Sequence, residues 1–209
     1  MSIPRINERA PAFRANSTHG EIALQDFAGS WVVLFSHPAD FTPVCTTEFV
    51  GFARIAEELR AINTRLIGLS VDSIYSHIAW MRTIEEQFGV QVTFPVIADT
   101  DRQVAELYGM VHPGESSTAT VRAVFVIDPE GLVRALIYYP LTTGRVVAEV
   151  LRLVKALQLN TEHALATPEG WEPGDACIVP PPTTTAAASE RMESEHEVSD
   201  WFFAKTPSP

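Results

Sequence analysis

The chain has 209 residues and a mass of 23.0 kDa, and 46% of its residues are hydrophobic, which suffices for one full core with an appended element. Its formal net charge of −11 argues against broad electrostatic contact with nucleic acid or an anionic membrane, so we expect neither as a partner. With only two cysteines, Cys45 and Cys177, a disulfide framework and a zinc cluster of paired cysteines are both excluded.

Short apolar runs rich in β-branched and aromatic residues predict buried strands, and they alternate with segments in which apolar residues recur at helical spacing. In chain order we expect strand 31–36, helix 45–60, strand 65–71, helices 73–88 and 102–108, strands 123–127 and 132–139, and helix 143–157. This alternation predicts an α/β fold with crossover connections. The turn at 128–131 (DPEG) makes the last two strands a hairpin, so the central sheet should be mixed.

The composition changes after about Asn160, where seven of the 15 prolines fall within 49 residues. We therefore expect one main domain at 1–160 and a C-terminal extension at 161–209. The stretch 180–188 (PPPTTTAAA) is interpreted as a linker or extended arm. The extension also holds apolar anchors that need a surface on the core or on a partner subunit: Trp171, Ile178, Val179, Trp201, Phe202 and Phe203.

Cys45 lies at a predicted helix start, because Thr42 is a good N-cap and Pro43 suits the first helical position. In the first turn of a helix, unpaired N–H groups and the helix dipole stabilise an anion, which favours a thiolate. Cys45 also precedes Phe49 of the apolar face by four residues, so its sulfur should point inward. A sheltered, reactive thiolate is what attack on an O–O bond requires.

The run 36–49 (SHPADFTPVCTTEF) resembles the peroxiredoxin signature, in which Pro38, Thr42 and Cys45 match at every required spacing. With His37 and the TTE that follows the cysteine, it is most similar to the one-cysteine branch that includes peroxiredoxin 6. Further matches lie at 121–128 (VRAVFVID), 139–145 (YPLTTGR) and 166–175 (ATPEGWEPGD). The resemblance implies a thioredoxin-like fold, with a mixed central β-sheet flanked by helices and followed by a C-terminal extension.

The resemblance also implies roles for individual residues. Cys45 would be the nucleophile, and Thr42 would hydrogen-bond the peroxide and the thiolate. Backbone N–H groups of Val44 and Cys45 would bind the peroxide oxygens, and Pro38 would shield the sulfenic acid from further oxidation. Arg122 would be the cation that favours the thiolate and stabilises charge on the leaving oxygen.

Two further residues have open assignments. Glu48 would orient an arginine, but a first-turn glutamate that favours the helix dipole is an alternative. His37 would lie close to the reactive sulfur and tune its oxidised state, although a histidine at a strand end is usually a structural residue.

The resemblance implies a thiol-dependent peroxidase that reduces hydrogen peroxide and organic hydroperoxides through a Cys45 sulfenic acid, in antioxidant defence. We expect no cofactor and no metal. The expected partners are an external thiol or thiol-disulfide protein as reductant and a second copy of the chain, as a homodimer or a ring of dimers. Cys177 lies in an apolar run (CIV) and is expected to be a buried packing group, with a resolving cysteine as the alternative.

Other functions were weighed against this one. A phospholipase of the kind found in mammalian members would need a serine site at 28–32, but here Ser30 lacks a partner histidine because Gln25 stands in its place. A cysteine hydrolase using Cys45 and His37 lacks a third group, and a redox-gated chaperone would need the same Cys45 chemistry. The chain shows no apolar run of membrane-spanning length and no signal peptide, so we expect a cytoplasmic protein.

Overall fold

The computed structural model describes residues 3–194 and 196–209. Its elements, in chain order, are β1 (Arg14–Ser17), β2 (Gly20–Ala23), the 3₁₀ helix η1 (Leu24–Phe27), β3 (Trp31–Ser36), α1 (Pro43–Ala61), β4 (Thr64–Ser70), α2 (Ile74–Phe88), β5 (Val96–Ala98), α3 (Gln103–Leu107), β6 (Arg122–Ile127), β7 (Val133–Tyr139), α4 (Val147–His163), β8 (Cys177–Val179), α5 (Thr185–Met192), β9 (Glu197–Asp200) and β10 (Phe203–Thr206). The chain divides into two compact units, residues 1–147 and 148–209. The division at residue 160 drawn from composition stays a prediction.

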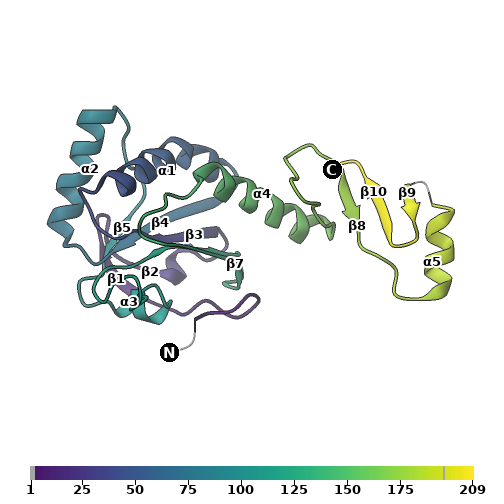
Figure 1. Ribbon diagram of the computed structural model, residues 1–209, viewed down its shortest axis with the longest axis horizontal. Coiled ribbons are helices and arrows are strands. Elements are labelled where there is room, and N and C mark those ends of the chain that lie inside the picture. Colours follow the sequence, from purple (N-terminus) through teal and green to yellow (C-terminus); the bar gives the residue numbers. More distant parts are fainter. Residues whose placement is uncertain (1–2, 195) are drawn as a thin grey trace. The chain divides into compact units, whose positions relative to one another are not determined.

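A seven-stranded sheet forms the first unit, in the order β2-β1-β5-β4-β3-β6-β7 (Figure 1). Strands β3, β4 and β5 are parallel, whereas β6 is antiparallel to β3 and to β7. The predicted hairpin joins β6 to β7, with the N–H of Gly131 donating to the carbonyl of Asp128 at 2.9 Å. The expected mixed sheet with flanking helices and a C-terminal extension is therefore confirmed.

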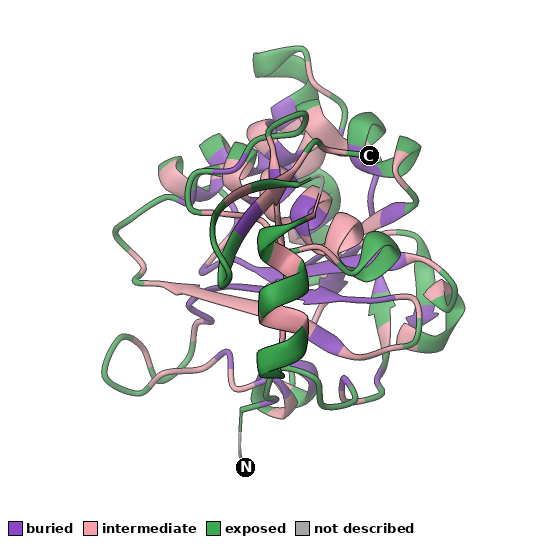
Figure 2. Ribbon diagram, turned by 90° about the vertical axis from the view of Figure 1, so that its right-hand side faces the viewer, coloured by how far each residue is buried: buried purple, intermediate pink, exposed green. Residues whose placement is uncertain are grey.

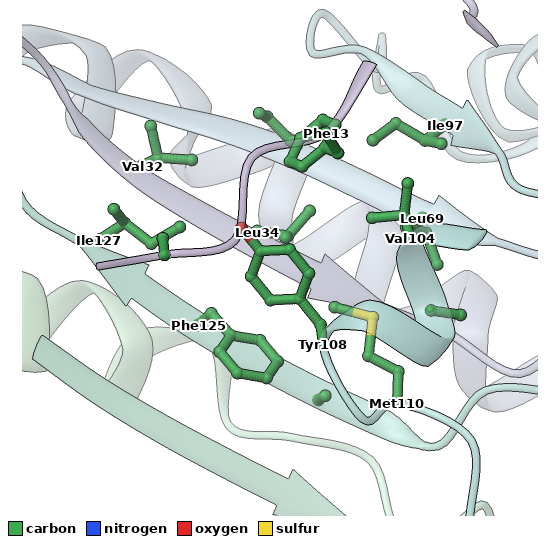
Figure 3. Packing of buried hydrophobic residues seen from close by; sticks show 14 of the residues in the cluster. Phe13, Val32, Leu34, Leu69, Ile97, Val104, Tyr108, Met110, Phe125 and Ile127 are labelled. Carbon is green, nitrogen blue, oxygen red and sulfur yellow. The ribbon is translucent and has the colours of Figure 1, made fainter. Parts of the chain in front are cut away.

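Strand β3 is buried along its whole length because both faces of the sheet are covered there. On one face Val32 and Leu34 join the cluster that contains Tyr108 and Phe125 (Figure 3). On the other face the ring of Phe35 stacks on that of Phe52 from α1, with centroids 4.1 Å apart. This packing fixes α1 against the end of β3, which positions the first turn of α1.

The longer predicted elements are present, and the main differences arise from tertiary contacts. The helix expected at 143–157 begins at Val147 and ends at His163, and Arg145 lies before it, where its N–H donates to the carboxylate of Glu48 at 2.7 Å. Strands β1, β2 and β5 were not predicted. They have only three or four residues each, too few for a clear alternating pattern.

The second unit contains a three-stranded sheet in the order β8-β10-β9. The prediction of a linker or extended arm at 180–188 is wrong for its second half, where α5 begins. Thr184 caps this helix by accepting a hydrogen bond from the N–H of Ala187 at 3.2 Å, and the three alanines that follow favour helix. Of the predicted anchors, Trp171 is buried. Trp201, Phe202 and Phe203 remain 45%, 53% and 38% exposed.

Buried residues concentrate on the strands of the central sheet, and exposed residues lie on the outward sides of helices and on loops (Figure 2). None of the helices in residues 3–194 and 196–209 is both long and apolar enough to span a membrane.

Candidate active site

Cys45 is fully buried in the first turn of α1. Thr42 has the extended backbone of an N-cap, and Pro43 occupies the first helical position, as predicted. The first N–H to bond within the helix is that of Thr46, which donates to the carbonyl of Thr42 at 3.0 Å. The N–H groups of Val44 and Cys45 precede it, where amides have no partner inside the helix. The sulfur is thus placed at the positive end of the helix dipole.

Arg122, the first residue of β6, is brought to the sulfur from a distant part of the chain. Its Nη1 lies 3.4 Å from Sγ of Cys45 and 2.7 Å from Oε2 of Glu48. Its Nε and Nη2 donate to the carbonyl of Leu141 at 3.0 and 2.7 Å. Because the guanidinium is buried and held on both edges, its position relative to the sulfur is fixed.

Glu48, one turn after Cys45, lies between two arginines. Arg145 donates to Oε1 from its backbone N–H at 2.7 Å and from Nε at 2.9 Å, and its Nη2 donates to Oε2 at 2.8 Å. Burial would raise the pKa of the Glu48 carboxyl, but the hydrogen bonds and charge of Arg145, together with Arg122, hold it below its ordinary value. Two guanidinium groups and one carboxylate leave one positive charge in excess, which an anionic sulfur would balance.

Sequence reasoning assigned no role to Arg145, although it ends the matching stretch 139–145. Glu48 contacts two arginines, where one was expected, and its role in orienting them stays a prediction. A methyl group added at Gly144 would lie 3.3 Å from Cγ1 of Val44, so the 139–145 segment passes close to the helix start.

Thr42 and Pro38 lie in the segment between β3 and α1. The Thr42 hydroxyl donates to the carbonyl of Ala39 at 2.8 Å, and it makes no side-chain capping bond to α1. Pro38 is buried. Their predicted roles toward peroxide and sulfenic acid stay predictions.

His37 is buried and belongs to a cluster with Asp40 and His77 that sequence reasoning missed. Nε2 of His37 lies 2.8 Å from one oxygen of Asp40, and Nδ1 of His77 lies 2.7 Å from the other. Burial would raise the pKa of Asp40, but the hydrogen bonds from both rings hold it well below its ordinary value. Burial lowers the pKa of His37 despite the hydrogen bond to Asp40.

The spacing of these three residues would allow them to bind a metal ion, since one potential ligand atom from each lies within 4.8 Å of the others. However, both oxygens of Asp40 already make short hydrogen bonds to the two rings, so this carboxylate is satisfied without a metal ion.

Glu48→Gln is expected to lower the free energy of unfolding by about 3 kcal/mol at neutral pH, because it removes the carboxylate that pairs with two buried guanidinium groups. Since the folded-state pKa of Glu48 lies below the ordinary 4.5, its contribution is present above pH 4.5 and is lost as pH falls toward the folded value. Urea unfolding of wild type and variant at several pH values measures the loss of stability and its pH dependence. A gap between wild type and variant that does not narrow in acid would contradict this account.

The phospholipase alternative gains no support from the geometry at Ser30. Its hydroxyl donates to Oδ1 of Asn63 at 2.9 Å, and the amide of Asn63 donates to the carbonyl of Gly29. Ser30 therefore serves as a turn residue at the start of β3.

The chain matches known proteins along most of its length. Residues 6–136 match the AhpC/TSA family, and residues 156–195 match the C-terminal domain of 1-Cys peroxiredoxin. The chain belongs to the peroxiredoxin family. A peroxiredoxin of Aquifex aeolicus is 54% identical to it, with 98% of this chain and 97% of the relative covered.

Solved structures of peroxiredoxins also resemble this one. A yeast mitochondrial 1-Cys peroxiredoxin, described in connection with thiol resolution by glutathione and thioredoxin systems, has a TM-score of 0.88 at 43% identity, covering 99% of this chain and 100% of its own. A cysteine-to-serine mutant of peroxiredoxin 6 from Arenicola marina has a TM-score of 0.87 at 36% identity, covering 98% of each chain. The protein is a thiol-dependent peroxidase of the one-cysteine type.

Proposed function

We propose that Cys45 carries the peroxidase reaction with Arg122, Thr42 and the first amides of α1 as its catalytic partners. The Cys45 thiolate attacks one oxygen of a hydroperoxide, the O–O bond breaks, and the other oxygen leaves as an alkoxide or hydroxide that takes up a proton. The sulfur is oxidised by two electrons to a sulfenic acid, and the peroxide is reduced to an alcohol or water. The observation that carries this proposal is the 3.4 Å approach of a buried, fixed guanidinium to the sulfur.

Each partner has a role that follows from its position. Arg122 favours the thiolate and stabilises the negative charge that develops on the leaving oxygen. The N–H groups of Val44 and Cys45 donate to the peroxide oxygens, since the helix leaves them without internal partners. The Thr42 hydroxyl turns from the carbonyl of Ala39 toward the peroxide when substrate is bound. Pro38 shields the sulfenic acid that results.

His37 is proposed to tune the oxidised state of Cys45. Its ring lies 4.7 Å from that of Phe49, one turn beyond Cys45 in α1. Its Nδ1 is buried without a hydrogen-bond partner among the described residues. A buried acceptor without a donor carries a desolvation cost, which a donor formed during turnover would relieve.

We assign the second half of the cycle to an external thiol. A thiolate from a small thiol or a thiol-disulfide protein attacks the sulfenic sulfur, water leaves, and a second thiol releases Cys45 and a disulfide. Cys177 is fully buried in β8, and its Sγ lies 3.9 Å from the carbonyl of Asp175. A buried thiol of this kind is a packing group rather than a nucleophile.

Cys177→Ser is expected to keep full turnover with dithiothreitol, because Cys177 takes no part in resolution. Oxidised wild-type protein should run as a monomer on a non-reducing denaturing gel. After one equivalent of hydrogen peroxide, dimedone should label Cys45 in both proteins, as read by mass spectrometry. A Cys45 to Cys177 disulfide, lost together with turnover in Cys177→Ser, would overturn the one-cysteine assignment.

We further assign a homodimeric or ring-forming assembly and a cytoplasmic role in antioxidant defence and redox homeostasis. The support for assembly is the exposed aromatic group Trp201, Phe202 and Phe203, which is unusual on the surface of a monomer. Sedimentation velocity distinguishes these states, and a monomer at micromolar concentration would refute the assembly.

A further inference from the structure

The cluster of His37, Asp40 and His77 contains two buried titratable side chains, Asp40 and His77, to which the proposed reaction gives no role. Each of the three side chains is at most 1% exposed. They come from the segment after β3 and from α2, so the fold itself brings them together.

The hydrogen-bond partners of His77 determine which of its ring nitrogens carry a proton. Its Nε2 lies 3.1 Å from the carbonyl oxygen of Ile97, which can only accept, so Nε2 carries a proton. Its Nδ1 lies 2.7 Å from Oδ2 of Asp40, which is also an acceptor when ionised. With a donor at each ring nitrogen, His77 is an imidazolium.

The ionised state of Asp40 is consistent with its other contacts. Its Oδ1 accepts from Nε2 of His37 at 2.8 Å, in addition to the bond from His77. The depressed pKa of its carboxyl agrees with two ring donors. Asp72 also lies near the cluster and accepts from the backbone N–H of Asp40 at 2.9 Å and from the Ser70 hydroxyl at 2.7 Å.

The tautomer of His37 also follows from its hydrogen-bond partners. Nδ1 of His37 has no hydrogen-bond partner among the described residues, so a second proton would be buried without an acceptor and the ring holds one. Burial lowers the pKa of His37, in agreement with a neutral ring. On Nε2 this proton makes a charge-assisted hydrogen bond to Asp40, whereas on Nδ1 it would have no acceptor among the described residues. Nδ1 is therefore left as a bare lone pair.

The cluster is connected to both halves of the peroxidase site. The ring of Trp80 lies 5.1 Å from that of His37, and its indole N–H donates to the hydroxyl of Thr46, the residue after Cys45, at 3.2 Å. Thr120, two residues before Arg122, donates from its hydroxyl to the carbonyl of His37 at 2.7 Å. A shift in the position of His37 would therefore displace residues next to both α1 and β6.

We infer that His77 is a positioning residue for the peroxidase site: as a buried imidazolium it keeps Asp40 ionised, and Asp40 holds His37 in the tautomer with a bare Nδ1. This inference rests on the proposed function in one respect, namely that Cys45 is the reacting group and His37 tunes its oxidised state. His77 itself need not touch the peroxide.

Histidine ring NMR tests the proton assignment in the intact, reduced wild-type protein. With ¹⁵N-labelled histidine, long-range proton–nitrogen correlations distinguish a protonated from a bare ring nitrogen, and His37→Asn and His77→Asn assign the two rings. We expect two protonated nitrogens in His77, and a bare Nδ1 with a protonated Nε2 in His37. A bare nitrogen in His77, or a proton on Nδ1 of His37, would overturn the inference. So would coordination of both rings by one added equivalent of Zn²⁺.

The consequence for the site is tested by His77→Leu, with His112→Asn as the matched control. In His77→Leu, Asp40 loses its counter-charge and takes up a proton, so His37 should gain a population protonated at Nδ1. Peroxide reduction should slow about tenfold, because the ring that packs on Phe49, one turn after Cys45, is displaced. His112 stacks on Tyr138 at 5.2 Å, away from the cluster, so His112→Asn should keep both the His37 spectrum and the rate.

An unchanged His37 spectrum in a folded His77→Leu protein would refute the positioning role. If that variant does not fold, the wild-type spectrum alone decides the proton assignment on which the inference depends. Failure of the proposed function would give a different result. The wild-type protein would then consume no peroxide, whichever tautomers its histidines adopt.

Discussion

Cys45→Ser is expected to abolish peroxide reduction, with a loss of at least roughly three orders of magnitude in turnover, because removal of a nucleophile leaves only residual binding effects. A serine hydroxyl in the same place remains un-ionised near neutral pH and is a weak nucleophile toward oxygen. The fold should persist, since the substitution is nearly isosteric and its oxygen can still accept the hydrogen bond from Arg122. Stopped-flow mixing with hydrogen peroxide and a dithiothreitol-coupled assay measure the loss.

Cys177→Ser is the matched control for that experiment, because it makes the same chemical change at the other buried cysteine. Circular dichroism and thermal unfolding should show both variants folded. Substantial turnover in Cys45→Ser, or equal losses in the two variants, would remove Cys45 from the centre of the mechanism.

The local sequence around Cys45 was enough to predict the start of its helix. The pair Thr42 and Pro43 predicted a boundary that the structure places at Pro43, and the spacing to Phe49 predicted the burial of the sulfur. These are local properties of a chain whose preferences agree with its tertiary packing.

Contacts between residues far apart in the sequence could not be predicted in this way. Asp40 and His77 are 37 positions apart, and Glu48 and Arg145 are 97 positions apart. Periodicity carries no information about such pairs. For Arg145 periodicity was misleading, since the helix expected from residue 143 begins at Val147 and Arg145 lies before it, in the buried ion pair with Glu48. Arg122 was assigned to the site from the family resemblance alone, because a lone arginine before a strand is usually a surface residue.

Arg122→Ala is expected to slow peroxide reduction by about a hundred- to a thousandfold, the loss typical of removing one preorganised donor to a developing charge. In the reduced protein, the excess positive charge of the site falls from one to zero, since Glu48 then faces Arg145 alone. The thiolate is therefore less favoured, and alkylation of Cys45 by iodoacetamide should require more alkaline solution. The fold should persist, because Arg145 still neutralises the buried Glu48 carboxylate.

Arg134→Ala provides the comparison, since Arg134 lies on the neighbouring strand β7 and pairs with Asp128 at 3.2 Å, with a side chain that is 26% exposed. It carries the same charge but makes none of the contacts that hold Arg122 beside the sulfur. Its removal should change neither the rate of peroxide reduction nor the pH dependence of alkylation. Equal effects in the two variants would mean that the general charge of the protein, and not the guanidinium 3.4 Å from the sulfur, activates Cys45.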